Sequence, residues 1–187
     1  MLFNQDIEIG AALQSGDLSV KLMEEKTRYS LRIKPNELAA FKKASGLKLP
    51  AKIGKSTRTT SHTYLCLGPD EWMVITTPEN SNELRVKLEK TAAEFIYSYT
   101  DVSHRNVGFV LSGKQAASAI NIGCPLDLSL DAFPIGKAAR TVFENAPIMI
   151  LRTKTAEFQL ECWRSFAPYI CGFFDRYETD ISAYISE

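Results

Sequence analysis

The residues of this chain best suited to chemistry lie together in one run, Asp101-Val102-Ser103-His104-Arg105. An acid, a hydroxyl, an imidazole and a guanidinium are the groups that nucleophilic and acid–base catalysis use. Apolar segments rich in β-forming residues precede and follow the run, which places it at the end of a predicted strand. Polar groups gathered there must be hydrogen-bonded or hydrated, so the run marks either a functional site or a structured corner.

The spacing of this run favours the corner. Neighbouring side chains of an extended strand point to opposite faces, so Ser103 and His104 are poorly placed to act as nucleophile and base. The sequence also lacks a Gly-x-Ser-x-Gly elbow and a Gly-x-Gly-x-x-Gly dinucleotide fingerprint. We therefore predict no catalytic residue, and we expect Asp101 and Arg105 to tie strand ends or a subunit contact together.

Charge and composition exclude several classes of partner. Lysine and arginine total 22 and aspartate and glutamate total 22, so no net field attracts nucleic acid or an anionic membrane. An apolar fraction of 45% is ordinary for a globular domain and argues against disorder. We find no signal peptide and no apolar run long enough to span a bilayer, and therefore expect a cytoplasmic protein with no nucleic-acid or membrane partner.

Cysteine and histidine are too scattered to predict a metal site. The cysteines form no Cys-x-x-Cys pair, and only His62 and His104 could complete a set of ligands. We interpret Cys66 and Cys162 as reduced thiols that fill apolar positions in strands.

Hydrophobic periodicity predicts an α+β fold of two mixed subdomains, 25–102 and 103–187, after an N-terminal arm over 1–24. The first subdomain has the order strand, helix, two hairpin strands, helix and strand, which is typical of a ferredoxin-like split βαβ unit. Its elements are predicted at 29–33, at 35–46 with Gly46 as a cap, at 64–67, 72–75 and 82–95, and in a strand ending at Asp101.

The second subdomain is predicted to mix strands and helices in a comparable way. A Ser112-x-x-Gln115 capping box opens its first helix, and Ser165 caps a long closing helix that carries an apolar stripe. Strands are predicted at 107–111, 138–143, 148–152 and 157–163. We predict the basic stretch from Lys48 to Arg58, in the first subdomain, to be a mobile loop.

Two tryptophans are expected to play different parts. Trp72 lies among buried strand residues and is interpreted as core. Trp163 alternates onto the polar face of its strand and is followed by aromatic and basic residues, a combination that concentrates energy in protein interfaces. We therefore predict a set of subunit-contact residues at the corner and after this last strand: Asp101, Ser103, His104, Arg105, Trp163, Arg164, Phe166 and Tyr169.

Four blocks of the sequence resemble, in order and spacing, the gamma subunit family of heterotetrameric sarcosine oxidase, over residues 25 to 175. The blocks are Leu67-Gly68-Pro69-Asp70-Glu71-Trp72, Asp101-Val102-Ser103-His104-Arg105, Cys124-Pro125-Leu126-Asp127-Leu128-Ser129-Leu130 and Trp163-Arg164-Ser165-Phe166-Ala167-Pro168-Tyr169. The resemblance implies a bacterial complex of alpha, beta, gamma and delta chains that oxidises sarcosine to glycine, forms hydrogen peroxide and passes a one-carbon unit to tetrahydrofolate. It also implies that FAD, FMN, NAD and tetrahydrofolate belong to the partner chains, so we expect no cofactor bound by this chain alone.

The gamma fold is itself similar to the folate-binding domain of the glycine-cleavage aminomethyltransferase. That wider group usually carries a folate-contacting aspartate in the strand that corresponds to 148–151, whereas the segment from Asn145 to Ile150 has no carboxylate. The Lys-Gly-Cys motif of the folate-binding iron–sulfur repair proteins is also missing. Since one-carbon transfer needs an anion beside the developing iminium, a catalytic role is disfavoured.

The sequence therefore predicts a non-catalytic gamma subunit with a structural, assembly role. Two alternatives stay open: an autonomous folate-binding, aminomethyltransferase-like protein, and a structural domain that associates with itself.

Overall fold

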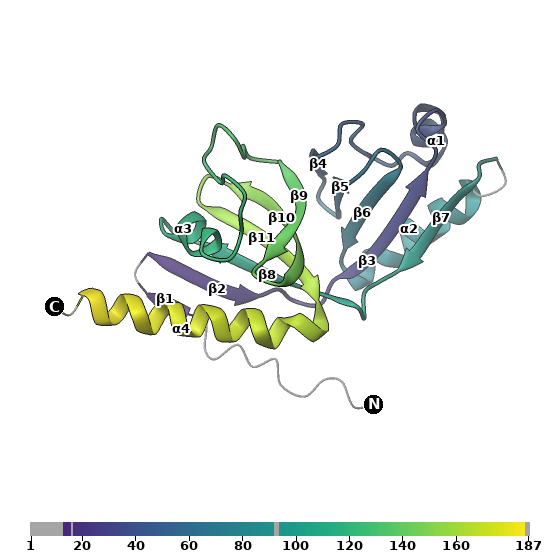
Figure 1. Cartoon of the computed structure of the whole chain (residues 1–187). Coiled ribbons are helices and arrows are strands. Elements are labelled where there is room, and N and C mark those ends of the chain that lie inside the picture. The colour runs from purple at the N-terminus through teal and green to yellow at the C-terminus, as the bar shows by residue number, and fades with distance from the viewer. Residues whose placement is uncertain (1–12, 16, 92–93, 186–187) are drawn as a thin grey trace. The chain divides into compact units, whose positions relative to one another are not determined.

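A computed structural model of the chain describes residues 13–15, 17–91 and 94–185. These residues form two compact units, each described here by itself (Figure 1). The central unit contains Glu24–Arg105 with the short segment Gly136–Ala139, and the terminal unit contains the chain before and after it, Met1–Met23, Asn106–Ile135 and Arg140–Glu187. Among the described helices, none is both long and apolar enough to cross a membrane.

The central unit is the predicted ferredoxin-like unit with one additional edge strand. Its described elements are β3 (Thr27–Ile33), α1 (Leu38–Ser45), β4 (Ser56–Arg58), β5 (His62–Cys66), β6 (Glu71–Thr76), α2 (Pro78–Thr91) and β7 (Tyr97–Asp101). They give a five-stranded sheet in the order β4-β5-β6-β3-β7, and each neighbouring pair is antiparallel. The first and third strands of the split βαβ order therefore lie side by side, as the sequence pattern predicts.

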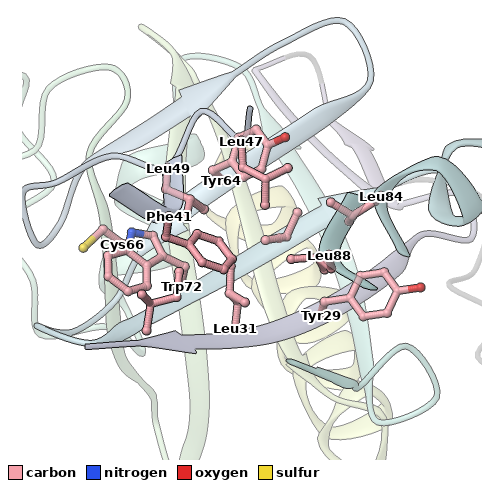
Figure 2. Packing of buried hydrophobic residues seen from close by; sticks show 12 residues of the cluster. Tyr29, Leu31, Phe41, Leu47, Leu49, Tyr64, Cys66, Trp72, Leu84 and Leu88 are labelled. Atoms are coloured by element: carbon pink, nitrogen blue, oxygen red, sulfur yellow. The ribbon is translucent and has the colours of Figure 1, made fainter. Parts of the chain in front are cut away.

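The core of the central unit lies between its sheet and its helices. Leu31, Phe41, Trp72 and Leu84 are 1% exposed or less and pack in one cluster with other strand and helix residues (Figure 2). Alternate strand residues reach this cluster because successive side chains of a strand point to opposite faces. Burial of these large apolar side chains is the dominant favourable contribution to folding of the unit.

Helix α1 ends as predicted. Gly46 adopts the left-handed conformation, with φ of 71°, and its N–H donates to the Lys42 carbonyl at 3.0 Å. Glycine is suited to this position because it has no Cβ to clash there. The end of α1 is therefore fixed locally by the sequence.

Two other predicted features of the central unit differ in the structure. Helix α2 begins at Pro78 rather than at residue 82, since proline fits the first turn of a helix, where no intrahelical N–H bond is needed. The basic stretch that was predicted to be a loop contains β4, which pairs with β5, and the Ser56 N–H and hydroxyl both donate to the Gly136 carbonyl. That stretch is therefore tied to the sheet by backbone hydrogen bonds.

The terminal unit is built around a second antiparallel sheet. Its described elements are β1 (Leu13–Ser15), β2 (Leu18–Leu22), β8 (Asn106–Ser112), α3 (Ala116–Asn121), β9 (Ala138–Phe143), β10 (Ala146–Lys154), β11 (Glu157–Trp163), a 3₁₀ turn η1 (Arg164–Phe166) and α4 (Ala167–Ile185). The six strands follow the order β1-β2-β8-β11-β10-β9, and α4 packs against β1. The predicted fold class, an α+β chain with two sheets, is confirmed.

Residues 13–22 were predicted to be part of an arm, but they form β1 and β2. Leu18 and Val20 are buried, at 4% and 2% exposure, and Val20 lies opposite Leu111 of β8. Apolar and polar residues alternate along β2, so one face of the strand is buried where it pairs with β8.

Two predicted helix caps in the terminal unit are wrong. Ser112 is the last residue of β8, opposite Glu157 of β11, and α3 begins only at Ala116 after Gln115. Ser165 lies inside the turn η1, and α4 begins at Ala167. In both places tertiary pairing or a tighter turn replaces the local capping geometry that the sequence suggests.

Candidate functional site

The run at the end of β7 is a hydrogen-bonded corner. The Asp101 Oδ1 accepts from the Ser103 N–H at 2.8 Å and from the Ser103 hydroxyl at 2.5 Å. The Ser103 Oγ in turn accepts from the Arg28 N–H at 2.9 Å, at the start of β3. Asp101 and Ser103 therefore join the ends of two neighbouring strands.

The backbone of the same run completes the corner. The Val102 N–H donates to the Arg28 carbonyl at 2.8 Å, and the Arg105 N–H donates to the Val102 carbonyl at 3.1 Å. Val102 is buried, whereas the side chains of His104 and Arg105 are exposed. The tie between strand ends runs through Asp101, Ser103 and the backbone of Arg28, a residue that the sequence did not single out.

The geometry of the corner leaves little room for nucleophilic chemistry. The Ser103 hydroxyl already donates to Asp101 and accepts from Arg28, so its proton and one lone pair are engaged. Burial, followed by the charge of Asp101, raises the pKa of the neighbouring Tyr29 phenol, which therefore stays neutral at physiological pH. The corner holds strands together and presents the Ser103–Arg105 backbone at the surface.

The turn after β11 has a different character. Trp163 is 46% exposed and its ring lies 6.1 Å from the Phe166 ring, while Tyr169 is 40% exposed. Ala167 and Ile170, between and after them, are fully buried and anchor the start of α4. We call the segment from Trp163 to Tyr169 the aromatic turn; its large side chains reach solvent from a fixed backbone.

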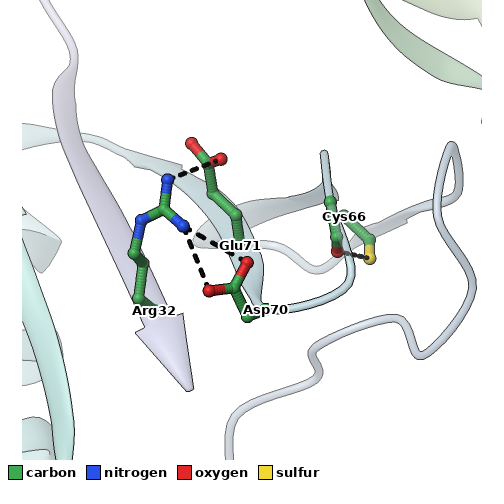
Figure 3. Close-up of polar contacts among 5 residues, drawn as sticks. Arg32, Cys66, Asp70 and Glu71 are labelled. Carbon is green, nitrogen blue, oxygen red and sulfur yellow. Dashed lines mark hydrogen bonds and ion pairs between the residues drawn. The ribbon is translucent and has the colours of Figure 1, made fainter. Parts of the chain in front are cut away.

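The Leu67–Trp72 block forms the end of the β5–β6 hairpin. Arg32 binds both carboxylates of this turn: its Nη1 donates to Asp70 Oδ2 at 3.1 Å and its Nη2 to Glu71 Oε2 at 3.1 Å (Figure 3). The Trp72 indole N–H donates to the Pro50 carbonyl at 2.8 Å, which satisfies the polar atom of a buried ring. Arg32 of β3 thus holds the hairpin turn near the surface, and the buried Trp72 ties its end to Pro50.

The Cys124–Leu130 block is held by a buried arginine that the sequence did not predict. Arg152 of β10 is 2% exposed; its Nη2 donates to the Leu128 carbonyl and its Nη1 to the Thr155 carbonyl at 2.5 Å. The guanidinium carbon lies 4.4 Å from the centroid of the Phe158 ring. Burial lowers the pKa of Arg152. An arginine in a strand normally signals a surface position, so no sequence signal marks this role.

His62 is the buried histidine of the described chain. Its Nδ1 lies 2.8 Å from the Thr76 hydroxyl, which itself donates to the Ser61 carbonyl at 2.9 Å. The hydroxyl therefore accepts from His62, and the imidazole is held as the Nδ1–H tautomer. Burial lowers the pKa of His62. The charge of Glu83 raises this pKa by a smaller amount, and the charge of Lys87 lowers it.

The described residues do not form the sites that a metal or a folate would need. Among them, no group of three histidine, cysteine, aspartate or glutamate side chains could hold a metal ion. At the start of β10, Ile148, Met149 and Ile150 are all buried apolar residues, and no carboxylate stands where the aminomethyltransferase resemblance expects one. This strand does not fit the folate contact of that wider group.

The two units define the fold class: an α+β chain with two antiparallel sheets, a fold that is also seen in a solved aminomethyltransferase. A solved glycine cleavage system aminomethyltransferase T from Bartonella henselae superposes with a TM-score of 0.65 at 15% identity, over 84% of this chain and 45% of that one. The chain belongs to the sarcosine oxidase, gamma subunit family, which matches residues 32–182. The resemblance and fold predicted from the four blocks are confirmed.

Individual relatives agree with this family. The sarcosine oxidase subunit gamma of Corynebacterium sp. (strain P-1) is 30% identical over 142 residues, which cover 74% of this chain and 69% of that protein. The Arthrobacter sp. protein of the same name is 32% identical over 133 residues, 68% of this chain and 63% of that one. A chain of the heterotetrameric sarcosine oxidase from Corynebacterium sp. U-96 has the same fold, with a TM-score of 0.80 at 24% identity over 90% and 88% of the two chains.

Proposed function

We propose that this chain is the gamma subunit of a sarcosine oxidase complex and acts by binding the larger chains rather than by chemistry of its own. Its partners in this proposal are the alpha, beta and delta subunits, in the cytoplasm. The complex oxidises sarcosine to glycine, reduces oxygen to hydrogen peroxide and transfers the one-carbon unit to tetrahydrofolate. FAD, FMN, NAD and tetrahydrofolate belong to the partner chains.

The observation that carries this proposal is the family match over residues 32–182, which includes all four blocks. Within the blocks, three of the carboxylates are engaged in holding the fold. Asp101 binds Ser103, and Asp70 and Glu71 bind Arg32. A subunit that supplies shape needs these internal contacts and no reacting group.

The aromatic turn supports a binding role. Trp163, Arg164, Phe166 and Tyr169 combine residue types that dominate interface energies when they enter a pocket of the partner. We assign two contact surfaces, one to these residues and one to the exposed side chains of His104 and Arg105 at the corner, where Asp101 and Ser103 join the strand ends. Because the aromatic turn is anchored by buried Ala167 and Ile170, little conformational entropy is lost on binding.

Co-expression with the other subunits tests the proposal. A tagged gamma chain should co-elute with flavin absorbance in size exclusion, and Trp163→Ala should reduce the flavin recovered per gamma chain roughly tenfold or more, as loss of a hot-spot side chain does. Val142→Ala, at a residue that is 40% exposed and lies outside the proposed contact set, is the matched control. Elution of the native chain without flavin would contradict the proposal.

A calorimetric titration of the gamma chain expressed alone separates a structural subunit from a folate-binding one. The isolated gamma chain should give no saturable heat with tetrahydrofolate, because β10 offers no carboxylate beside Ile148 and Ile150. Saturable binding by the isolated chain would favour an autonomous aminomethyltransferase-like protein.

A further inference from the structure

One edge of the central sheet is an extended row of backbone groups with an open side. Strand β7 is last in the order β4-β5-β6-β3-β7, and within the described residues it pairs with β3 and with no other strand. Its residues are Tyr97, Ser98, Tyr99, Thr100 and Asp101, of which Ser98, Thr100 and Asp101 are exposed. Such an edge can accept a further strand by main-chain hydrogen bonding.

Two hydrogen bonds fix which groups of β7 point to the open side. The Val102 N–H donates to Arg28 of β3, so alternation along an antiparallel pair directs Ser98 and Thr100 toward β3 as well. On β3 itself, the Ile33 N–H donates to the Asp70 carbonyl on the β6 side. The odd-numbered residues of β3 therefore bond toward β6 and the even-numbered ones toward β7, which agrees with the Val102 bond.

Three residues of β7 therefore direct their N–H and C=O groups away from β3, toward the open edge of the sheet: Tyr97, Tyr99 and Asp101. No hydrogen bond from the N–H of any of these three residues to another part of the described chain is found. Each of them offers one donor and one acceptor in strand geometry.

The strand is held rigidly by the side chains of the same residues. The Tyr97 hydroxyl donates to the Leu88 carbonyl, and the Tyr97 ring lies 5.1 Å from Phe41 and 6.3 Å from Tyr99. Tyr99 makes an edge contact with Tyr29 at 5.7 Å. Since both rings pack on the helix side, the edge is already formed before anything binds to it, which lowers the entropic cost of adding a strand.

β7 carries little of the protection that edge strands usually have. It contains no lysine and no proline, its one charged side chain, Asp101, is bonded to Ser103 at the end of the strand, and Ile96 directly before it is 75% exposed. The opposite edge, β4, is only three residues long and carries Arg58, and the residue directly before it, Lys55, forms a bridge with Lys137. The two edges of the same sheet thus differ. The β4 edge has three residues with a bridge beside it, and the β7 edge has five residues and pairs on its outer side with no strand of the described chain.

We propose that β7 is a strand-addition site at which an extended segment of a partner chain of the oxidase complex continues the central sheet; this rests on the proposed function. A second copy of this chain is the less suitable occupant. A five-residue strand supplies far fewer than the roughly 20–30 residues on each side of a stable interface, so it must be part of a wider contact, and the solved relative with the same fold is a chain of a heterotetramer.

Residue-resolved hydrogen exchange on the free chain and on the co-purified complex tests this site. In the free chain, the amides of Tyr97, Tyr99 and Asp101 should exchange fast while those of Ser98 and Thr100 are protected by β3. In the complex, the three outward amides should slow by roughly tenfold or more, because each gains a main-chain bond. Unchanged exchange at Tyr97 and Tyr99 in a complex that still carries flavin overturns the strand-addition site and leaves the proposed function standing.

A pair of variants gives a second readout. Tyr99→Ala and Tyr99→Pro both lose the ring, but only the proline loses the outward N–H. With folding of each checked by circular dichroism, Tyr99→Pro should bind the partner chains roughly fivefold more weakly than Tyr99→Ala, the change expected from one main-chain hydrogen bond. Equal affinities overturn the site, and so does concentration-dependent self-association of the free chain that protects the same amides. A native chain that recovers no flavin removes both this site and the proposed function.

Discussion

The corner at Asp101–Arg105 and the aromatic turn at Trp163–Tyr169 were both predicted as contact residues, yet the structure uses them differently. In the corner, the acid and the hydroxyl are bonded to each other and to the backbone of Arg28. In the aromatic turn, Trp163 and Tyr169 reach solvent while Ala167 and Ile170 fix the backbone beneath them. Polar groups of the corner build the scaffold, whereas the aromatic side chains of the turn reach solvent.

This difference indicates how the proposed non-catalytic subunit can keep polar residues in its blocks. Polar side chains at a strand end satisfy backbone groups that would otherwise be unpaired, so their loss costs stability. Exposed aromatic side chains contribute little to the fold of the free chain, and their value lies in a partner pocket. Variants of the two kinds should therefore separate stability from assembly.

The largest effect is expected at the two tryptophans. Trp72→Ala removes a ring that is 1% exposed and leaves the Pro50 carbonyl without its indole donor, so the free energy of unfolding should fall by about 3–5 kcal/mol. Trp163→Ala should change it by less than about 1 kcal/mol, because that ring is half exposed. Urea denaturation of both variants measures the contrast. Equal losses would mean that the aromatic turn is also part of the scaffold.

A smaller loss is expected at the buried arginine. Arg152→Ala leaves the Leu128 and Thr155 carbonyls without donors and uncovers the Phe158 ring, and should lower the free energy of unfolding by about 2–3 kcal/mol. Arg140→Ala, at an exposed position on β9, serves as the control for loss of a cation. If the two variants unfold at the same urea concentration, Arg152 does not hold the Cys124–Leu130 block.

The corner should show an intermediate effect on stability and none on assembly. Asp101→Ala removes the acceptor for the Ser103 N–H and hydroxyl and should cost about 1 kcal/mol. Thr100→Ala, one residue earlier and exposed, is the matched control. The flavin recovered per folded gamma chain should match that of the native protein. A large loss of flavin with unchanged stability would move Asp101 from the scaffold to the contact surface.

The smallest effect is a pH dependence from His62. Its folded pKa is lowered by burial, so between that value and the unfolded pKa of about 6.5 the unfolded chain binds more protons than the folded one. Stability should therefore rise with pH through this window and be lost as the pH falls below about 6.5. Thermal melts at several pH values should show a shallower slope for His62→Asn. A native slope of the opposite sign would show that the imidazole is charged in the fold.

Much of the central unit could be predicted because its signals are local. Period-two burial of β3, the left-handed Gly46 and the Gly68-Pro69 hairpin each follow from short-range geometry. The ferredoxin-like order then follows from the sequence of elements. The family resemblance needed only the four blocks, whose residues turned out to make identifiable contacts.

The features that sequence missed depend on distant partners. β2 is a strand because Leu18 and Val20 are buried beside β8, which lies far along the chain. Ser112 belongs to β8 because Glu157 pairs with it, which overrides its local capping pattern. Arg152 is buried because two carbonyls and an aromatic ring surround its guanidinium. No spacing of residue types in the sequence predicts such an environment.

The central claim, that this chain contributes contact surface and no reacting group, is tested most directly by turnover of the assembled complex. Sarcosine oxidation per bound flavin should be measured for the native complex and for one carrying Ser103→Ala and His104→Ala together. We predict the same turnover number within about twofold, since neither group takes part in chemistry. A fall of about 100-fold or more, the size expected for loss of a general base or nucleophile, would contradict the claim.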